Sequence, residues 1–160
     1  MRSPSGATER GRAASASPLA RILFGVYVLL VAYASLYPLQ GWHDHGLSPL
    51  AWLEAPWPRY VTYFDVAVNI IGYLPYGFLC VAALQPRLRG AAAFAAAVLS
   101  GVLLSLLLES AQSYLPARVE TNLDLLCNLA GAPAGAALGV AFAARLREAG
   151  PLQRGRARLF

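Results

Sequence analysis

The chain has 160 residues, of which 58% are hydrophobic and 13% are charged, and its formal net charge is +5. The charged share is about half that of a typical soluble domain, which excludes a water-soluble globular protein and makes lipid the solvent for most of the chain. All 13 basic residues are arginines that lie between apolar runs rather than among aromatic side chains, so we expect no nucleic-acid partner.

Four apolar runs predict an all-α, polytopic membrane protein with four transmembrane helices. The runs cover about residues 21–39, 65–84, 90–111 and 122–144, close to the roughly 20 residues that cross a bilayer. Residues 1–20 are rich in Ser, Ala, Gly and Arg and are predicted to form a disordered cytoplasmic tail. Residues 146–160 are predicted to form a basic cytoplasmic tail, which leaves residues 21–145 as the membrane domain.

The first run has an alternative interpretation as a cleavable signal peptide. Ala32-Tyr33-Ala34 resembles a cleavage site that follows an apolar core with an arginine-rich lead. Cleavage there would leave three spans and would not change the orientation of the others.

The segment between the first two runs, residues 40–64, contains all three tryptophans of the chain. Trp and Tyr side chains favour the membrane interface, where an apolar ring meets a polar edge. Ser48-Pro49 is typical of a helix start, with Ser as the N-cap and Pro in the first turn, so we predict a short interfacial helix there.

The arginines indicate how the helices are oriented. In a four-helix arrangement, 11 of the 13 face the same side: Arg2, Arg10, Arg12, Arg21, Arg87, Arg89, Arg145, Arg147, Arg154, Arg156 and Arg158. Only Arg59 and Arg118 face the other side. Because basic segments stay in the cytoplasm, both termini are predicted to be cytoplasmic.

Six carboxylate and amide side chains interrupt the predicted spans near their outer ends, where lipid cannot satisfy them. They are Asp65, Asn69, Glu109, Gln112, Asp124 and Asn128. The spacing within each pair is i,i+4 or i,i+3, so each pair lies on one face of its helix. We therefore predict that these faces turn inward and form an outward-opening polar pocket, with Arg118 as the nearest positive charge and with a ligand-binding role.

Simpler roles remain open for single members of this set. Asp65 and Asp124 open their helices and would cap free backbone amides there, whereas Asn69 and Asn128 would provide hydrogen bonds between helices. Glu109 fits neither role, because it ends a helix, where the dipole disfavours a negative charge.

An internal repeat links the second and fourth helices. Both contain the frame D-x-x-x-N-x-x-G, beginning at Asp65 and at Asp124, and in both a Pro and a further Gly follow. Because both helices run in the same direction, we hypothesise that they occupy pseudo-equivalent positions around the third helix.

Two patterns in the apolar runs concern packing. Gly131, Gly135 and Gly139 form a stripe on one face of the fourth helix, and we expect the alanine-rich start of the third helix to pack closely against it. Cys80 and Cys127 lie at different depths, so we interpret them as packing residues that form no disulfide.

Taken in chain order, these motifs resemble the VanZ-like family of bacterial membrane proteins, over about residues 22–144. The resemblance is carried by Ser35-Leu36-Tyr37-Pro38, Asp65 and Asn69 leading to Pro75 and Gly77, Glu109-Ser110-Ala111-Gln112, Arg118, and Asp124 and Asn128 with Gly131. The resemblance implies a four-helix domain in the bacterial cytoplasmic (inner) membrane. The founding member of that family is associated with resistance to the lipoglycopeptide teicoplanin, but the resemblance supplies no reaction for this chain.

Three kinds of function remain open at this point. The first is binding or modulating a lipid-linked or amphipathic envelope molecule in the polar pocket, with membrane lipids as partners. Three acids against one base favour a cationic group or a divalent cation over a bare phosphate. The second is an enzyme that acts on a lipid head group, with two carboxylates as acid and base. The third is a structural accessory bundle, in which the glycine stripe matters more than the acids.

No resident cofactor is predicted. His43 and His45 could bind a metal as a pair, but they have no third ligand in the sequence, so we predict no metal site there.

Overall fold

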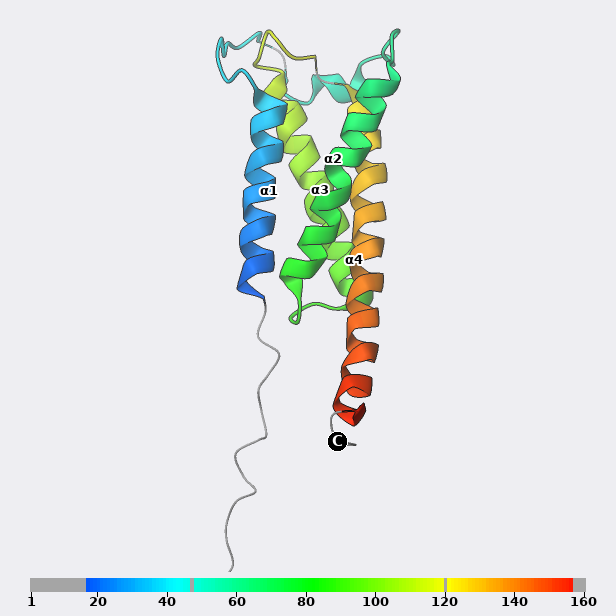
Figure 1. Ribbon diagram of the computed structural model, residues 1–160. Coiled ribbons are helices and arrows are strands. Elements are labelled where there is room, and N and C mark those ends of the chain that lie inside the picture. Colours follow the sequence, from blue (N-terminus) through cyan, green and yellow to red (C-terminus); the bar gives the residue numbers. More distant parts are fainter. Residues whose placement is uncertain (1–16, 47, 120, 157–160) are drawn as a thin grey trace, which may run out of the picture.

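The computed structural model describes residues 17–46, 48–119 and 121–156. Over these residues it is an all-α bundle of α1 (Pro18–Leu36), α2 (Tyr63–Leu84), α3 (Gly90–Gln112) and α4 (Asn122–Arg156), with a short 3₁₀ helix η1 (Ala51–Glu54). Segments 37–62 and 113–121 lie together at one end, which we call the loop end (Figure 1). The start of α1 and the end of α4 lie at the opposite, tail end.

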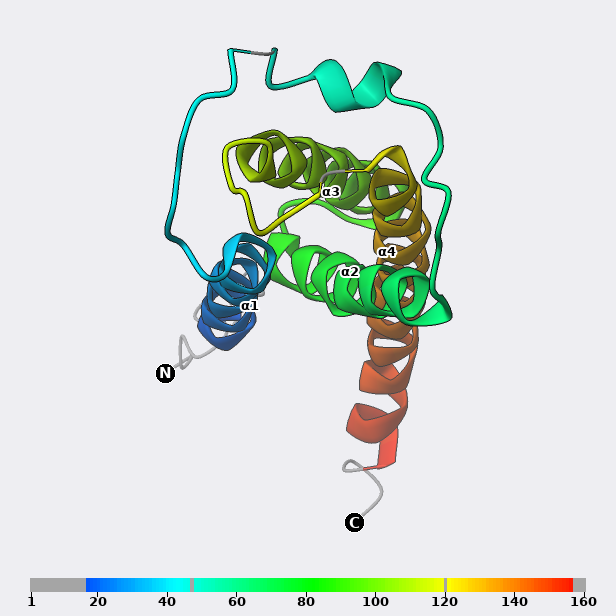
Figure 2. The same cartoon turned by 90° about the horizontal axis from the view of Figure 1, so that it is seen from above.

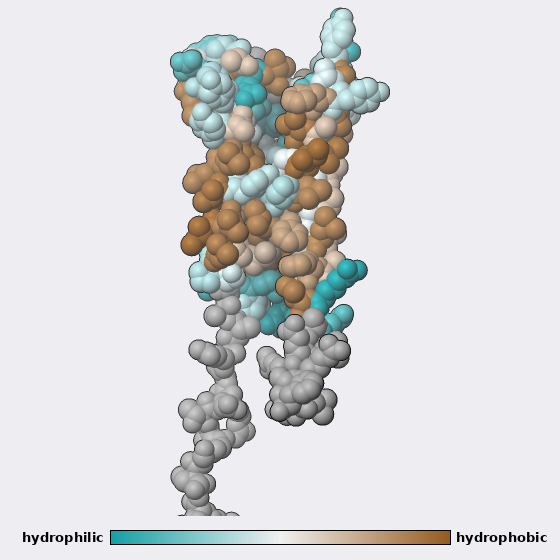
Figure 3. Space-filling model, in the orientation of Figure 1, coloured by the Kyte–Doolittle hydropathy of each residue, from teal (hydrophilic) through white to brown (hydrophobic). Residues whose placement is uncertain are grey.

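The four long helices are suited to a membrane by length and composition. Their apolar stretches contain 19, 22, 23 and 27 residues. Apolar side chains cover the middle of the visible face, and more polar residues gather towards both ends (Figure 3). The prediction of four helices that could span a membrane is therefore confirmed for the described residues.

The boundaries of α1 differ from those of the predicted run. The helix begins at Pro18 rather than at Arg21, because the Ser17 hydroxyl accepts a hydrogen bond from Ala20 N at 3.3 Å and caps the first turn. It ends at Leu36, before the Tyr-Pro dipeptide, because a residue that precedes proline is disfavoured in helical backbone.

The structure describes most of the predicted C-terminal tail but only the last residues of the predicted N-terminal tail. α4 runs on to Arg156, well into the tail predicted for residues 146–160, because arginine, leucine and glutamate favour helix even in water. The predicted disordered tail lies outside the described residues up to residue 16, as do residues 157–160.

Segment 37–62 runs around the periphery of the loop end (Figure 2). The short helix predicted at Ser48-Pro49 is instead the 3₁₀ turn Ala51–Glu54, and the Ser48 hydroxyl accepts from Leu50 N at 3.3 Å without capping an α-helix. Trp52 in this turn is buried, so one of the three predicted interfacial tryptophans instead anchors the segment to the protein.

Close packing of α2 on α4 depends on two glycines. A side chain at Gly77 would collide with Ala132 O in α4, and one at Gly135 would collide with Leu74 O in α2. The two contacts are reciprocal, because each glycine faces a backbone carbonyl of the other helix.

The prediction that the glycine stripe packs against the start of α3 is wrong. A Cβ at Gly131 would meet Ile70 O, and a Cβ at Gly139 would meet Val81 and Phe78, so the stripe faces α2 throughout. Any helix backbone can fit such a stripe, and the alanine-rich start of α3 has no special complementarity to it.

α3 instead packs against the neighbouring face of α4. Gly101 of α3 lies against Ala132, and fully buried alanines of both helices, Ala97 and Ala136 among them, form a core cluster with Cys80. The two cysteines are free and buried, as predicted. Unlike the other three helices, α1 has no fully buried residue and lies at the edge of the bundle.

Candidate functional site

A cavity of about 640 Å³ occupies the loop-end half of the bundle, bounded by all four long helices and by residues of both loops. It is lined by every residue of the predicted polar pocket: Asp65, Asn69, Glu109, Gln112, Arg118, Asp124 and Asn128. The helix faces that carry these side chains therefore turn towards one space. Their role in binding a ligand stays a prediction at this stage.

The layer nearest the loop end contains the two helix-opening acids. In each case a threonine three residues earlier accepts from the acid's backbone amide: Thr62 from Asp65 N at 3.1 Å, and Thr121 from Asp124 N at 3.0 Å. Side-chain acceptors at this position satisfy the free amides of a first helical turn. The repeat thus extends by one threonine towards the loop end, a feature that the sequence reasoning missed.

Beyond this shared capping, the two acids differ. Asp65 is exposed, and its carboxylate accepts from the Thr62 hydroxyl at 2.6 Å. Asp124 is half-buried and accepts from Asn69 Nδ2 at 2.6 Å, which joins α2 to α4 across the cavity. Asp65 and Asp124 therefore lie on the same side of the bundle, as the repeat hypothesis requires.

The next layer, about one helical turn deeper, is almost fully enclosed. Glu109 is 5% exposed, and its Oε2 accepts from Thr121 N at 3.3 Å. Asn128 is 4% exposed and donates from Nδ2 to Ser105 Oγ at 2.9 Å, whereas its Oδ1 has no hydrogen-bond partner. A buried amide oxygen without a donor is rare in native proteins and costs free energy, so this acceptor needs a partner.

The two asparagines of the repeat therefore have different partners. Asn69 bonds to α4, whereas Asn128 bonds to α3. The helices share a frame and reciprocal glycine contacts, but their polar contacts are not equivalent around α3.

Two polar residues of this layer were not recognised from the sequence. Ser105 is fully buried, and Tyr73 is buried with its hydroxyl lacking a hydrogen-bond partner. Their positions could have revealed them, because Ser105 lies four residues before Glu109 and Tyr73 four residues after Asn69, on the same helix faces.

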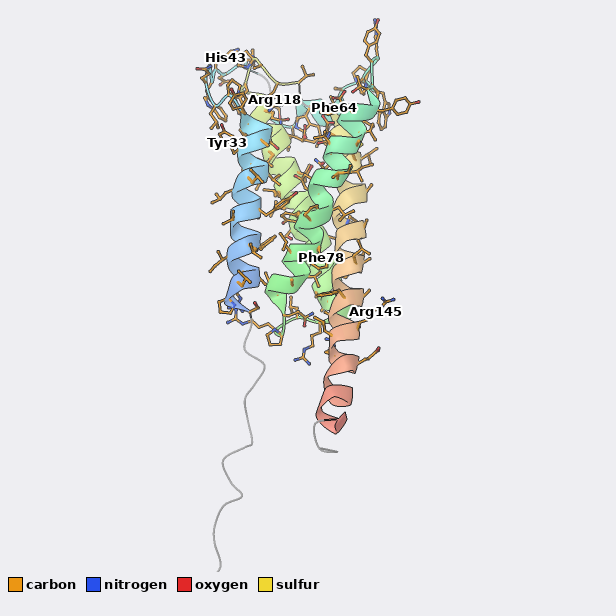
Figure 4. All side chains as sticks on the ribbon, viewed as in Figure 1. Tyr33, His43, Phe64, Phe78, Arg118 and Arg145 are labelled. Atoms are coloured by element: carbon orange, nitrogen blue, oxygen red, sulfur yellow. The ribbon has the colours of Figure 1, made fainter. Side chains whose placement is uncertain are left out.

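Gln112 and Arg118 hold α1 in place. Gln112 Nε2 donates to Ser35 O at 2.9 Å, and Arg118 donates to Tyr37 O from Nε at 3.0 Å and to Ala34 O from Nη2 at 2.5 Å. Figure 4 shows Arg118 at the loop end, next to the last turn of α1. These donors satisfy carbonyls that have no partner within the helix, and the cation suits the negative end of its dipole.

The histidines lie apart from this cavity. The rings of His43 and His45 are 3.9 Å apart in the loop, and His43 Nδ1 lies 2.8 Å from Gly41 O. Within the described part of the chain, no group of three or more His, Cys, Asp or Glu side chains is arranged to hold a metal ion. Each cavity carboxylate accepts a hydrogen bond of its own, from Thr62, Asn69 or Thr121.

Four apolar helices, each long enough to cross a membrane, define a small multi-pass membrane protein of the all-α class. The family model described as VanZ/LLP1 matches residues 23–143, and the chain belongs to this family. The resemblance seen in the sequence motifs is thereby confirmed. Comparison with curated proteins and with solved structures gave no match.

Proposed function

We propose that this protein binds an amphipathic molecule of the cell envelope in the loop-end cavity, through a head group that is cationic or rich in hydrogen-bond donors. The observation that carries the proposal is the acceptor-rich floor of the cavity. Asn128 Oδ1 is buried there without a donor, in a space that Asp65, Glu109 and Asp124 also line. A guest with donors would bond to the carboxylate oxygens that line this space.

The charge of the cavity favours a cation over an anion. Three carboxylates and one guanidinium line it, and that guanidinium already donates to the carbonyls of α1. Charges in a partly enclosed site attract or repel more strongly than in water. A bare phosphate would therefore meet net repulsion, whereas an ammonium group would meet attraction.

The lining also suits a guest with an apolar part. Besides the polar floor, Leu30, Val31 and Val68 form walls of the same cavity. Its volume of about 640 Å³ lies within the roughly 300–1,000 Å³ of typical ligand pockets. Mixed walls of this kind are typical of sites that orient one polar end of a largely apolar molecule.

The arginine distribution supports a periplasmic location for the cavity. Positive segments at the tail end would keep both termini in the cytoplasm of a bacterial inner membrane, so the loop end would face outward. The guest would then be a molecule of the outer leaflet or of the space beyond it.

The test uses purified protein in lipid nanodiscs that contain a photoactivatable phosphatidylethanolamine, whose ammonium head group matches the proposed chemistry. We expect Glu109→Gln and Asp124→Asn to lower photocapture at least fivefold at equal protein levels. Glu54→Gln and Asp44→Asn make the same chemical changes at loop residues outside the cavity lining and should leave capture unchanged. Equal capture by all four variants would contradict the proposed function.

The enzyme interpretation has one observation in its favour, because Glu109 and Asp124 line one cavity. The same nanodiscs test it. Conversion of envelope lipids by the wild-type protein that Glu109→Gln abolishes would establish turnover, whereas capture without conversion would leave binding as the function.

A further inference from the structure

The hydrogen bonds and the ring contact between α1 and α2 lie in the tail-end half of α1, and Val28 and Val31 just beyond them pack against the cluster of Tyr73, Tyr76 and Ala132. Arg21 Nε donates to Ala83 O at 3.4 Å, the rings of Phe24 and Tyr76 are 5.3 Å apart, and the Tyr27 hydroxyl donates to Gly72 O at 2.8 Å. The two helices diverge towards the loop end (Figure 1), where α2 lies close to α4 (Figure 2). The cavity lies between these diverging halves.

At the loop end, α1 is tied to the opposite side of the cavity. Its last carbonyls accept from Gln112 at the end of α3 and from Arg118 in the loop that follows α3. These bonds hold α1 towards α3 rather than towards α2. The space between α1 and α2 therefore stays open on the side that faces the surrounding lipid.

This opening has apolar edges and a polar interior. Leu30 on α1 and Phe64 and Val68 on α2 line the cavity and are also exposed on the outside of the protein. In the space-filling view, pale and teal residues are visible between the brown surfaces of α1 and α2 (Figure 3). Behind the edges lies the floor of Asn69, Glu109 and Asn128.

The height of the opening matches one leaflet of a bilayer. From Phe64 to Gly72 the helix rises about 12 Å, at roughly 1.5 Å per residue. One leaflet accounts for about 15 Å of the hydrocarbon core, which is roughly 30 Å thick. The opening thus spans most of the leaflet on the loop side and closes at the Tyr27–Gly72 hydrogen bond near the middle of the helices.

We infer that the cavity takes a membrane lipid sideways from the loop-side leaflet, through the opening between the loop-end halves of α1 and α2. The lipid head group enters the polar floor, and the acyl chains stay in the hydrocarbon between Leu30 and Val68. This inference rests on the proposed function, and it names a bilayer lipid, rather than a water-soluble amphiphile, as the guest. Apolar edges at membrane depth fit this route, because the acyl chains then never leave an apolar environment.

The experiment narrows the opening while leaving the floor intact. Leu30→Trp and Val68→Trp place bulk on its two edges, at side chains that line the cavity and are 56% and 50% exposed. Leu29→Trp and Ile71→Trp are matched controls, because these side chains are 71% and 65% exposed but do not line the cavity. All four positions are exposed, so folding is expected to survive, and size-exclusion elution and thermal unfolding check this.

The probe is photoactivatable phosphatidylethanolamine with the reactive group on the acyl chain, in nanodiscs of phosphatidylethanolamine and phosphatidylglycerol. We expect the two edge variants to lower capture at least fivefold and the two controls to leave it unchanged. In the wild-type protein, the labelled peptides should contain the edge residues of α1 and α2. Soluble phosphoethanolamine, added in excess, should compete poorly.

The outcomes separate this inference from the proposed function. If the wild type captures lipid and Glu109→Gln lowers capture but the edge variants do not, the guest enters elsewhere and the sideways route is overturned. Acyl-chain labels concentrated on the outer faces of α3 and α4 would overturn it as well. If the wild type captures no lipid at all, the proposed function fails with it.

Discussion

Replacing Gly135 by alanine should destabilise the protein by about 2 kcal/mol, because the added methyl group has no room at the crossing of α2 and α4. A Cβ at this position would overlap Leu74 O and would press on Phe78 N, and both are backbone atoms. Unlike a side chain, a helix backbone cannot rotate away, so the two helices must separate.

The expected loss of unfolding free energy in Gly135→Ala combines two opposing effects. Overpacking of a tight contact costs about 1–3 kcal/mol, and a rigid backbone neighbour places this site near the upper value. Alanine favours helix over glycine by up to about 1 kcal/mol, which offsets part of the cost. The net loss of about 2 kcal/mol corresponds to roughly a thirtyfold shift in the unfolding equilibrium.

Gly72→Ala is the matched control, because a Cβ at Gly72 meets nothing within 4 Å. This variant should keep the stability of the wild type or gain up to about 1 kcal/mol. Reversible unfolding in mixed micelles with increasing sodium dodecyl sulfate measures both variants under one condition. If Gly135→Ala unfolds at the same detergent fraction as Gly72→Ala, the close crossing of α2 and α4 does not exist.

Gly77, which makes the reciprocal contact from α2, provides a second test of the same helix crossing. Gly77→Ala alone should cost about as much as Gly135→Ala, because its Cβ would collide with Ala132 O. The double variant should cost less than the two losses combined, because one separation of the helices makes room for both methyl groups. If the losses of unfolding free energy in the two single variants add fully in the double variant, Gly77 and Gly135 do not share one helix contact.

Three further substitutions test the polar layers and the loop. Asn69→Ala removes the donor to Asp124 Oδ1 and should destabilise the bundle by about 1 kcal/mol in the same unfolding assay; an unchanged midpoint would mean that water replaces this bond without loss. Trp52→Ala removes a buried ring and should cost about 3 kcal/mol, whereas Trp57→Ala removes an exposed one and should have little effect on unfolding. Arg118→Ala leaves carbonyls of α1 without their donor, so amide hydrogen exchange in the last turn of α1 should become about tenfold faster. Exchange at the wild-type rate would show that the guanidinium does not hold α1.

Much of the candidate site was predictable because it depends on local rules. Helical periodicity places Asp124 and Asn128 on one face, and the span boundaries place that face near one end of the bundle. Asp65 and Glu109 lie near the same end of the bundle for the same reason, and all four residues line the cavity. These relations hold for any packing of the helices that turns polar faces inward.

The residues that the sequence reasoning missed have only a weak local signal, and the hydrogen-bond partners of Arg118 have none. Ser105 and Tyr73 occur in apolar runs at little cost, so only their spacing of four residues from Glu109 and Asn69 marks them as members of the site. Arg118 can donate to a carboxylate or to a carbonyl, and only the position of α1 beside it decides that it binds Ala34 O and Tyr37 O.

The sequence by itself determined that this chain forms four apolar helices of the VanZ/LLP1 family with polar side chains grouped near one end, because length, hydropathy and helical spacing are properties of each segment alone. Only the tertiary structure decided which helices touch. The glycine stripe contacts α2 instead of α3. The last carbonyls of α1 accept hydrogen bonds from Gln112 and Arg118, and the loop end of α1 diverges from α2. Such choices depend on shape matching between whole helix faces, which no single segment encodes.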